Sequence, residues 1–73
     1  MAQEIVEAPI PGKIVSVNVS AGSPIEEEGE ICILESMKMQ NPILSPVDGT
    51  VTEVNITPGQ IVETGEVLAI IEY

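Results

Sequence analysis

A single lysine is the residue of this chain best suited to covalent chemistry. Lys38 stands in the run Glu35-Ser36-Met37-Lys38-Met39, at the midpoint of 73 residues, and is one of two basic side chains against 12 acidic ones. An amine on a flexible four-carbon stem is a common target of acylation, and modifying it need not disturb the packing of a fold. The position and isolation of Lys38 therefore indicate the attachment of a cofactor rather than an ordinary surface charge.

A catalytic role for Lys38 is an alternative that its surroundings oppose. An amine nucleophile must be neutral, and catalytic lysines reach that state by burial or beside other cations. Here carboxylates such as Glu35 accompany the lysine instead, and the chain has no histidine to act as a base. A chain of this length also has little room for a substrate pocket beside its core. We therefore predict a protein that is not itself an enzyme.

The charge balance limits the kinds of partner. A net charge of -10 opposes binding to nucleic acid and to anionic membranes, because both need a basic face. The same charge suits partners with basic docking surfaces and predicts a domain that is monomeric in isolation. No apolar stretch approaches the roughly 20 residues of a membrane span. With no basic-then-apolar leader at the start of the sequence, we expect a cytoplasmic protein.

Cysteine and histidine usage argues against a metal centre. The only cysteine, Cys32, lies within the apolar run 31–34, and the chain contains no histidine. Zinc and other transition metals are held mainly by those two residue types. We interpret Cys32 as a small buried hydrophobic residue in a reducing compartment.

The chain is built from two similar segments. Residues 8–19 match residues 45–56 in the spacing of prolines, glycines and branched aliphatic residues. Further along, the match continues after a one-residue shift that places Gly29 over Gly65. A unit this small cannot bury its apolar face alone, so the two copies must pack on each other.

Each copy has the pattern of β-strands. Residues 13–19 and 50–56 alternate between aliphatic and polar side chains, and 30–35 and 66–71 are short apolar runs of strand length. Glycine and proline recur too often for a helix of useful length. The sequence therefore predicts an all-β fold.

We expect one domain over residues 1–73, with repeat halves at about 8–36 and 45–72 and a lysine hairpin between them. The architecture predicted is a flattened barrel-sandwich of two antiparallel sheets with an internal pseudo-two-fold repeat. That symmetry places the connection 36–44 at the pole opposite the two chain ends, so Lys38 should project from one end. Glu35 to Gln40 are good helix formers on their own. The flanking strands and Pro42 lead us to expect a turn instead.

These residues resemble a known family. Glu35-Ser36-Met37-Lys38-Met39 is similar to the attachment motif of biotinyl domains, the carrier modules of biotin-dependent carboxylases and decarboxylases. The resemblance extends over about residues 7–72. It also includes Ala-Pro-Ile-Pro-Gly at 8–12, Ser-Pro-Val-Asp-Gly at 45–49 and Pro-Gly at 58–59.

The resemblance implies a biotin/lipoyl attachment fold and a biotin carboxyl carrier. Lys38 would carry biotin covalently, and Met37 and Met39 would be recognised by a biotin protein ligase. The family usually has alanine where this chain has Ser36, and since serine is also small we expect modification to survive. Segment 24–29 is too short for the protruding "thumb" of the bacterial acetyl-CoA carboxylase carrier, which implies a simpler, thumbless form.

The implied function is transport of an activated carboxyl group. Biotin on Lys38 would be loaded at a biotin carboxylase site and unloaded at a carboxyltransferase site, with the reverse flow in a decarboxylase. The protein would supply position and mobility while the cofactor carries the reactive atom. Those two subunits or domains are the implied partners, and the acceptor is not encoded near the lysine.

Two rival classes of function stay open at this point. A lipoyl acyl carrier shares the architecture, but it usually has aspartate before and alanine after the lysine, where this chain has Met37 and Met39. An unmodified sandwich that serves as an interaction domain is also compatible with the repeat. The two methionines lie two apart and would share one face of a strand, where they could simply fill gaps in packing. Lys13 has no such flanking residues and is read as an ordinary surface lysine.

Overall fold

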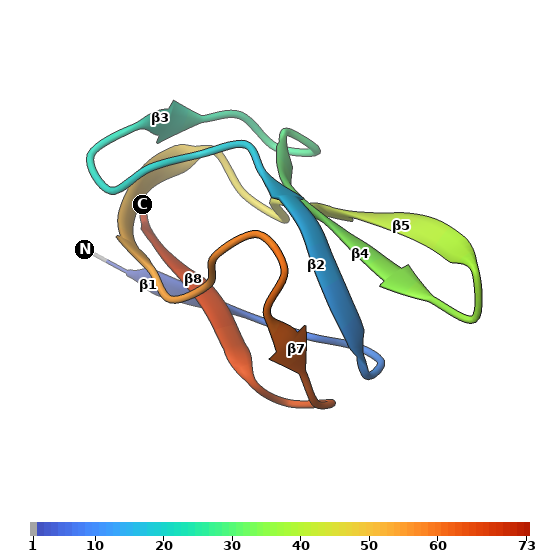
Figure 1. The fold of residues 1–73 in the computed structure, drawn as a ribbon. Coiled ribbons are helices and arrows are strands. Elements are labelled where there is room, and N and C mark those ends of the chain that lie inside the picture. The colour runs from blue at the N-terminus through green and yellow to red at the C-terminus, as the bar shows by residue number, and fades with distance from the viewer. Residues whose placement is uncertain (1) are drawn as a thin grey trace.

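The computed structural model describes residues 2–73, which form eight strands and no helix (Figure 1). Branched aliphatic residues and closely spaced glycines and prolines favour short strands joined by turns. Within the described residues no helix is long and apolar enough to cross a membrane. The strands are β1 (Gln3–Glu7), β2 (Gly12–Val17), β3 (Pro24–Ile25), β4 (Glu30–Ser36), β5 (Met39–Leu44), β6 (Gly49–Val54), β7 (Ile61–Val62) and β8 (Val67–Glu72).

The strands form two four-stranded antiparallel sheets whose orders are related by the repeat. One sheet has the order β1-β8-β6-β3 and the other β5-β4-β2-β7. We call β1 to β4 the first copy and β5 to β8 the second copy. Exchanging each strand of the first copy for its counterpart in the second converts one sheet order into the other. The predicted pseudo-two-fold sandwich is therefore confirmed, and each sheet contains strands of both copies.

The strand registers fix how the two copies correspond. Lys13 of β2 pairs with Glu35 of β4, and Thr50 of β6 pairs with Glu72 of β8. Residues 13 and 50 are therefore equivalent, as are residues 35 and 72, and each equivalent pair is 37 residues apart in the sequence. Both β2–β4 and β6–β8 also carry a register irregularity one residue further along. The repeat therefore preserves local defects as well as strand order.

The one-residue shift expected near Gly29 is wrong. The Glu28 amide donates to the Ser45 carbonyl at 2.7 Å, and the Gly65 amide donates to the Ala8 carbonyl at 2.8 Å. Glu28 is thus the counterpart of Gly65, and the spacing of 37 residues continues through the loop. The sequence comparison failed because it matched glycine to glycine, whereas the two loops place their glycine one position apart.

The predicted halves also start too late. Strand β5 fills most of the 36–44 segment that was expected to be a connection, and its counterpart β1 precedes residue 8. The four predicted strands are β2, β4, β6 and β8, and their ends differ from the prediction by at most two residues. The two-residue strands β3 and β7 were not predicted. Strand β5 was missed because Pro42 interrupts its alternating pattern.

The core lies between the two sheets and is made almost entirely of aliphatic side chains. Equivalent residues of the two copies meet there, and Ile14 and Val51 are both fully buried. Cys32 is also fully buried, as expected. The core residues are Val6, Ala8, Ile14, Ile25, Ile31, Cys32, Leu34, Ile43, Val51, Ile56, Val62, Leu68, Ala69 and Ile71.

The two poles of the sandwich have different roles. The molecule measures 36 × 18 × 17 Å, and the β4–β5 hairpin extends from one end while both chain ends lie at the other (Figure 1). At the chain-end pole Ala2 and Tyr73 exchange two backbone hydrogen bonds, of 2.7 and 2.9 Å. The predicted placement of Lys38 opposite the termini is confirmed.

Candidate cofactor-attachment site

Lys38 stands in a two-residue turn at the tip of the β4–β5 hairpin. Ser36 pairs with Met39, which leaves Met37 and Lys38 as the two central residues of the turn. Both have positive φ, 53° and 66°, as a type I′ turn requires. This turn matches the right-handed twist of its strands, but it costs about 1 kcal/mol at each residue that is not glycine. The hairpin context thus overrides the local helix preference of this segment.

The side chains of the attachment segment are open to solvent. Lys38 is exposed, Met37 is 92% exposed and Met39 is 65% exposed. The expectation that the two methionines share a strand face is wrong, because Met37 lies in the turn and only Met39 belongs to a strand. Exposure of this degree also excludes gap-filling in the core. An exposed lysine at a hairpin tip has space for a covalently attached group, so the residues present fit an attached biotin.

Two residues that sequence reasoning overlooked brace the base of the hairpin. The Asn41 side chain donates hydrogen bonds to the Leu34 carbonyl at 3.5 Å and to the Met39 carbonyl at 3.3 Å. Gly12 of β2 lies so close to the Glu35 carbonyl that a β-carbon there would overlap it. The available signal was the repeat itself, since Gly12 matches Gly49 in type as well as position.

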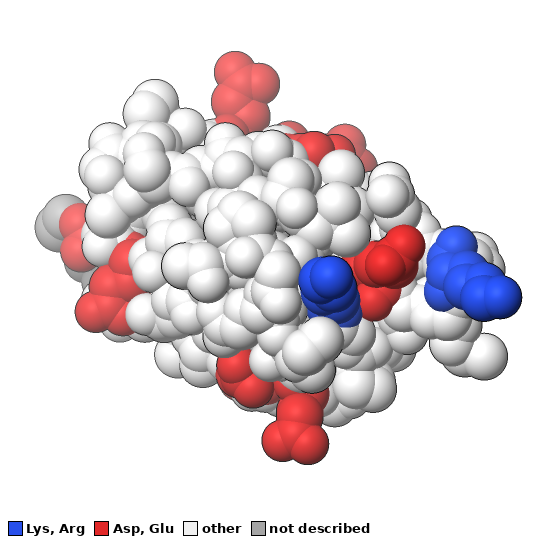
Figure 2. All heavy atoms as spheres, in the orientation of Figure 1, with Lys and Arg blue, Asp and Glu red and all other residues white. Residues whose placement is uncertain are grey.

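The two basic side chains lie at the hairpin end of the molecule. Figure 2 shows both on one face with an acidic side chain between them. Lys13 and Glu35 are direct cross-strand partners, and opposite charges in that arrangement favour the pairing of the strands. Lys13 thus differs from Lys38 in its environment, because it lies within a strand and pairs with Glu35 across the sheet.

Other candidate groups in the described residues do not form a second site. Burial, and secondarily the charge of Glu30, raise the pKa of the Cys32 thiol to about 11, which keeps it protonated and unreactive near neutral pH. No group of three or more potential metal-ligating side chains occurs among residues 2–73. Segment 24–29 is a two-residue strand followed by a tight turn, so the thumbless form is what the structure has there.

The comparison with protein families agrees with this geometry. The family described as "Biotin-requiring enzyme" matches residues 4–71, which include both copies and the hairpin. The chain belongs to this family. The fold is therefore that of a biotin carrier domain, and biotin is the cofactor that the family requires.

Curated relatives include the gamma subunits of two acyl-CoA decarboxylases. The gamma subunit of methylmalonyl-CoA decarboxylase from Veillonella parvula is 58% identical over 40 residues, covering 55% of this chain and 31% of that protein. The gamma subunit of glutaconyl-CoA decarboxylase from Acidaminococcus fermentans is 56% identical over 39 residues, covering 53% and 27%. The matched stretch spans less than a third of the length of these relatives.

Solved structures with this fold include parts of large carboxylases. A single-chain, multi-domain long-chain acyl-CoA carboxylase matches with a TM-score of 0.86 and 31% identity over 93% of this chain and 7% of that one. The urea carboxylase of Kluyveromyces lactis matches with a TM-score of 0.90 and 22% identity over 99% of this chain and 6% of that one. The second likeness supports the fold alone.

Proposed function

We propose that Lys38 is the residue to which biotin is attached and that the domain carries a carboxyl group between two active sites of a biotin-dependent enzyme. One observation carries this proposal: Lys38 is exposed at the apex of a strained two-residue turn, at the pole farthest from both chain ends. An amide between the lysine Nζ and the biotin carboxyl group would leave the cofactor on a long arm beyond the sandwich.

The division of labour follows from this geometry. Bound biotin supplies the ring nitrogen that carries the carboxyl group. The chain supplies a rigid base, because Asn41 of β5 bonds to β4 within the hairpin and Gly12 lets β2 lie closely against Glu35 of β4. Tethering at the other pole keeps the arm at high effective concentration near both active sites. In this proposal the domain itself performs no catalysis, and a biotin carboxylase and a carboxyltransferase act on its cargo.

Met37 and Met39 are proposed to identify the target lysine to a biotin protein ligase. Their exposure leaves two apolar side chains beside the amine, and burying them in a ligase would discriminate this lysine from others. Replacing both with threonine should slow biotinylation about tenfold. Replacing both with leucine, which keeps the apolar surface, should slow it less. Ser36 is half-buried at the end of β4, directly before the turn.

Intact mass spectrometry after co-expression with a biotin protein ligase tests the attachment site. The parent chain should gain one biotin, Lys38→Arg should gain none, and Lys13→Arg should gain as much as the parent. A gain that persists in Lys38→Arg would refute the assignment. A lipoyl increment from a lipoate ligase, with no biotin increment, would select the lipoyl carrier instead.

A further inference from the structure

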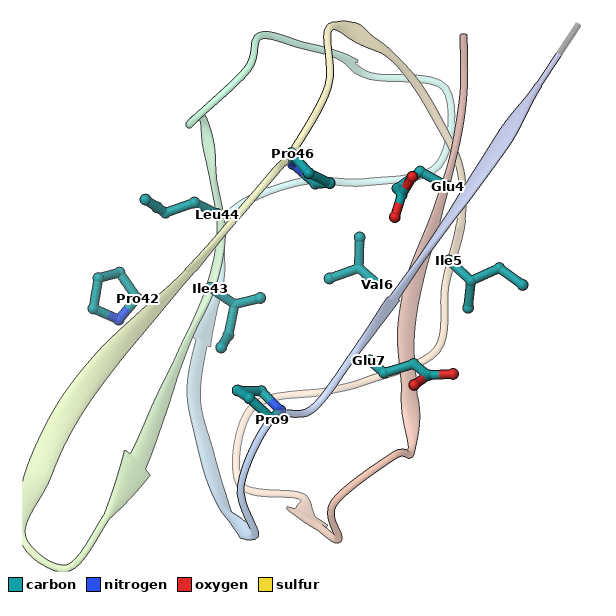
Figure 3. Close-up of a pocket in the computed structure, with 9 residues that line it drawn as sticks. All are labelled: Glu4, Ile5, Val6, Glu7, Pro9, Pro42, Ile43, Leu44 and Pro46. Carbon is teal, nitrogen blue, oxygen red and sulfur yellow. The ribbon is translucent and has the colours of Figure 1, made fainter.

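A groove lies between β1 and β5, the edge strands at one open side of the sandwich (Figure 3). Its volume is about 470 Å³. The buried side chains of Val6 and Ile43 point into it from opposite walls and form an apolar floor. These two residues are counterparts in the repeat, so the groove lies on the pseudo-two-fold axis. Any difference between its walls is therefore a departure from the symmetry.

The main-chain groups of the two walls differ. Ser36 and Met39 close a two-residue hairpin and so exchange hydrogen bonds. The alternation of an antiparallel ladder then turns the backbone of Pro42 away from β4, towards the groove. Proline has no N–H to donate there. The free edge of β5 is therefore closed to a further strand.

The wall formed by β1 retains its donors. Ala2 and Tyr73 exchange both backbone hydrogen bonds, so the same alternation turns the N–H and C=O groups of Gln3 and Ile5 away from β8. Ile5 is the counterpart of Pro42, with an N–H where the second copy has none. Strand β1 thus presents the hydrogen-bonding edge on which an extended peptide can add.

The side chains along this edge define what such a peptide must carry. Glu4 and Val6 face the groove, while Ile5 and Glu7 lie on the alternate side, and Ile5 is 50% exposed. The order is acidic-apolar-apolar-acidic. Direct cross-strand partners prefer opposite charge or shared apolar surface. The complementary strand is basic-apolar-apolar-basic, and this order reads the same in parallel and antiparallel pairing.

A second copy of this chain does not suit the edge. In an antiparallel pair of two β1 strands the outward groups of Gln3 and Ile5 would bond to each other. That register places Glu4 opposite Glu4 of the other copy, and like charges directly opposite each other are destabilising. Inward-facing charges at a free edge also protect a sheet from indiscriminate pairing. The second copy of the repeat achieves that protection with Pro42, and the first copy has carboxylates, which exclude neutral and acidic strands but admit a basic one.

We propose that the free edge of β1 is a docking site for an extended segment of a partner protein with the pattern basic-apolar-apolar-basic. This site lies on the side of the sandwich and uses neither Lys38 nor its flanking methionines. Docking there would hold the carrier by its side while the hairpin pole stays free. The interaction does not depend on biotin, so it stands or falls separately from the proposed attachment site.

The test is a titration of the isotope-labelled chain with short capped peptides, followed by amide chemical shifts. A peptide with the core Lys-Val-Val-Lys should shift the amides of Gln3 and Ile5, and its affinity should exceed that of Val-Lys-Lys-Val about fivefold. A Glu-Val-Val-Glu peptide should not bind. Biotinylation of the chain should change none of these results.

Two variants locate the interaction. Ile5→Pro places in β1 the residue that β5 has at the equivalent position, so the fold should tolerate it while binding is lost. Glu4→Gln with Glu7→Gln should weaken binding about tenfold.

Glu53→Gln with Glu63→Gln, two exposed carboxylates outside the groove, removes the same charge and should weaken binding less than twofold, an effect of about the size of screened surface charges. The proposal would be overturned if the two double variants lost equal affinity for the peptide. It would also be overturned if the parent chain bound Lys-Val-Val-Lys and Val-Lys-Lys-Val equally well. Either result would show that overall charge alone attracts the peptide. Retained binding in folded Ile5→Pro would overturn it too. Shifts of β1 amides that grow with protein concentration alone would identify a second copy as the occupant and have the same consequence.

Discussion

The loop before β4 and the loop before β8 are built on the same hydrogen bonds but place glycine and glutamate in opposite order. The first reads Glu28-Gly29 and the second Gly65-Glu66. In both, the earlier residue has positive φ, 69° at Glu28 and 88° at Gly65. Glycine adopts that conformation freely, whereas for glutamate it costs about 1 kcal/mol. The hydrogen-bond pattern, rather than residue type, is what the two copies share.

The later residue of each loop explains why the order is reversed. Gly29 lies where an added β-carbon would come within 2.8 Å of the Glu26 carbonyl oxygen. In the second copy Glu66 occupies this position and uses its carboxylate. One oxygen accepts from the Glu63 amide and the other from the Gln60 side chain, both at 3.3 Å. The second loop therefore gains two hydrogen bonds from Glu66 and avoids the backbone strain. The first loop has one carboxylate hydrogen bond, from the Glu27 amide to Asp48 at 2.7 Å, and keeps the strained Glu28.

The residues with a strained backbone are also unequally distributed between the two copies. Among the described residues, those with positive φ that are not glycine are Glu28, Met37 and Lys38. They belong to the first copy and to the turn that joins it to the second. The second copy has relaxed turns and ends in the pairing of the chain termini. The strain is concentrated in the part of the chain that leads to the attachment lysine.

The largest effects should come from positions where the copies agree. Gly12 and Gly49 each lie against a backbone carbonyl, of Glu35 and Glu72 respectively, and an added β-carbon would also approach a core side chain within 3.0 and 2.9 Å. Gly12→Ala and Gly49→Ala should each lower the free energy of unfolding by about 2–3 kcal/mol, measured by urea denaturation with circular dichroism. Costs that differ by more than about 1 kcal/mol would contradict the equivalence of the two sites.

Gly12→Ala and Gly49→Ala also distinguish an effect on stability from an effect on the rate of biotinylation. Only Gly12 supports the strand that leads to Lys38, so Gly12→Ala should slow biotinylation under conditions where both variants are folded. Gly49→Ala acts at the chain-end pole and should leave the rate unchanged. Gly22→Ala is the matched control for backbone strain alone, because its φ is 94° but no atom lies within 4 Å of the added carbon. It should lower the stability by about 1 kcal/mol.

A smaller effect is expected on the pH dependence of stability, and it should distinguish Cys32 from its counterpart Ala69. Burial raises the pKa of the Cys32 thiol from 9.0 to about 11, so above pH 9 the unfolded chain loses a proton that the folded chain keeps. Stability is therefore unaffected below pH 9 and falls as the pH rises towards 11, by at most about 1.4 kcal/mol per pH unit. Urea denaturation from pH 7 to pH 11 measures this slope.

Cys32→Ala places the residue of the second copy in the first and removes the thiol. Its stability should fall less steeply over the same pH range, since other groups that titrate there are unchanged. Identical slopes for the two proteins would show that the thiol is not held protonated by the fold. A thiol reagent should also react with the parent chain at pH 8 only when the chain unfolds.

The sequence was sufficient for the architecture because each copy repeats its strand pattern and its turn residues. The all-β class, the symmetry and the pole on which Lys38 lies all follow from that repetition. Strands β1 and β5 were not found because they are edge strands. Each has only one neighbouring strand, and Pro42 in β5 or the glutamates in β1 interrupt the apolar alternation that marks a strand with one buried face.

The geometry of the tip was beyond the reach of local sequence rules. Met37 and Lys38 have no preference for positive φ, and glycine or asparagine normally marks a type I′ turn. The turn is imposed by the pairing of β4 with β5, because Ser36 pairs with Met39 and only two residues connect them. The brace formed by Asn41 could not be recognised before β5 was known, because its role depends on facing Leu34 across the ladder.

The smallest expected effect tests whether the first copy is strained where the second is not. Glu28→Gly gives the first loop the glycine that the second has at position 65, and should raise the free energy of unfolding by about 0.5–1 kcal/mol. Gly65→Ala should lower it by about 1 kcal/mol. Urea denaturation of both variants beside the parent chain measures the two shifts.

The gain from Glu28→Gly has one competing contribution, the greater flexibility of glycine in the unfolded chain. Glu27→Gly controls for it, because Glu27 is the neighbouring exposed residue and does not have positive φ. Glu27→Gly should be destabilising, and the difference between the two variants isolates the strain at position 28. If both glycines lower the stability equally, Glu28 is unstrained. The reversed order of glycine and glutamate would then have no energetic consequence in the first loop, and the strain would be confined to Met37 and Lys38 at the tip.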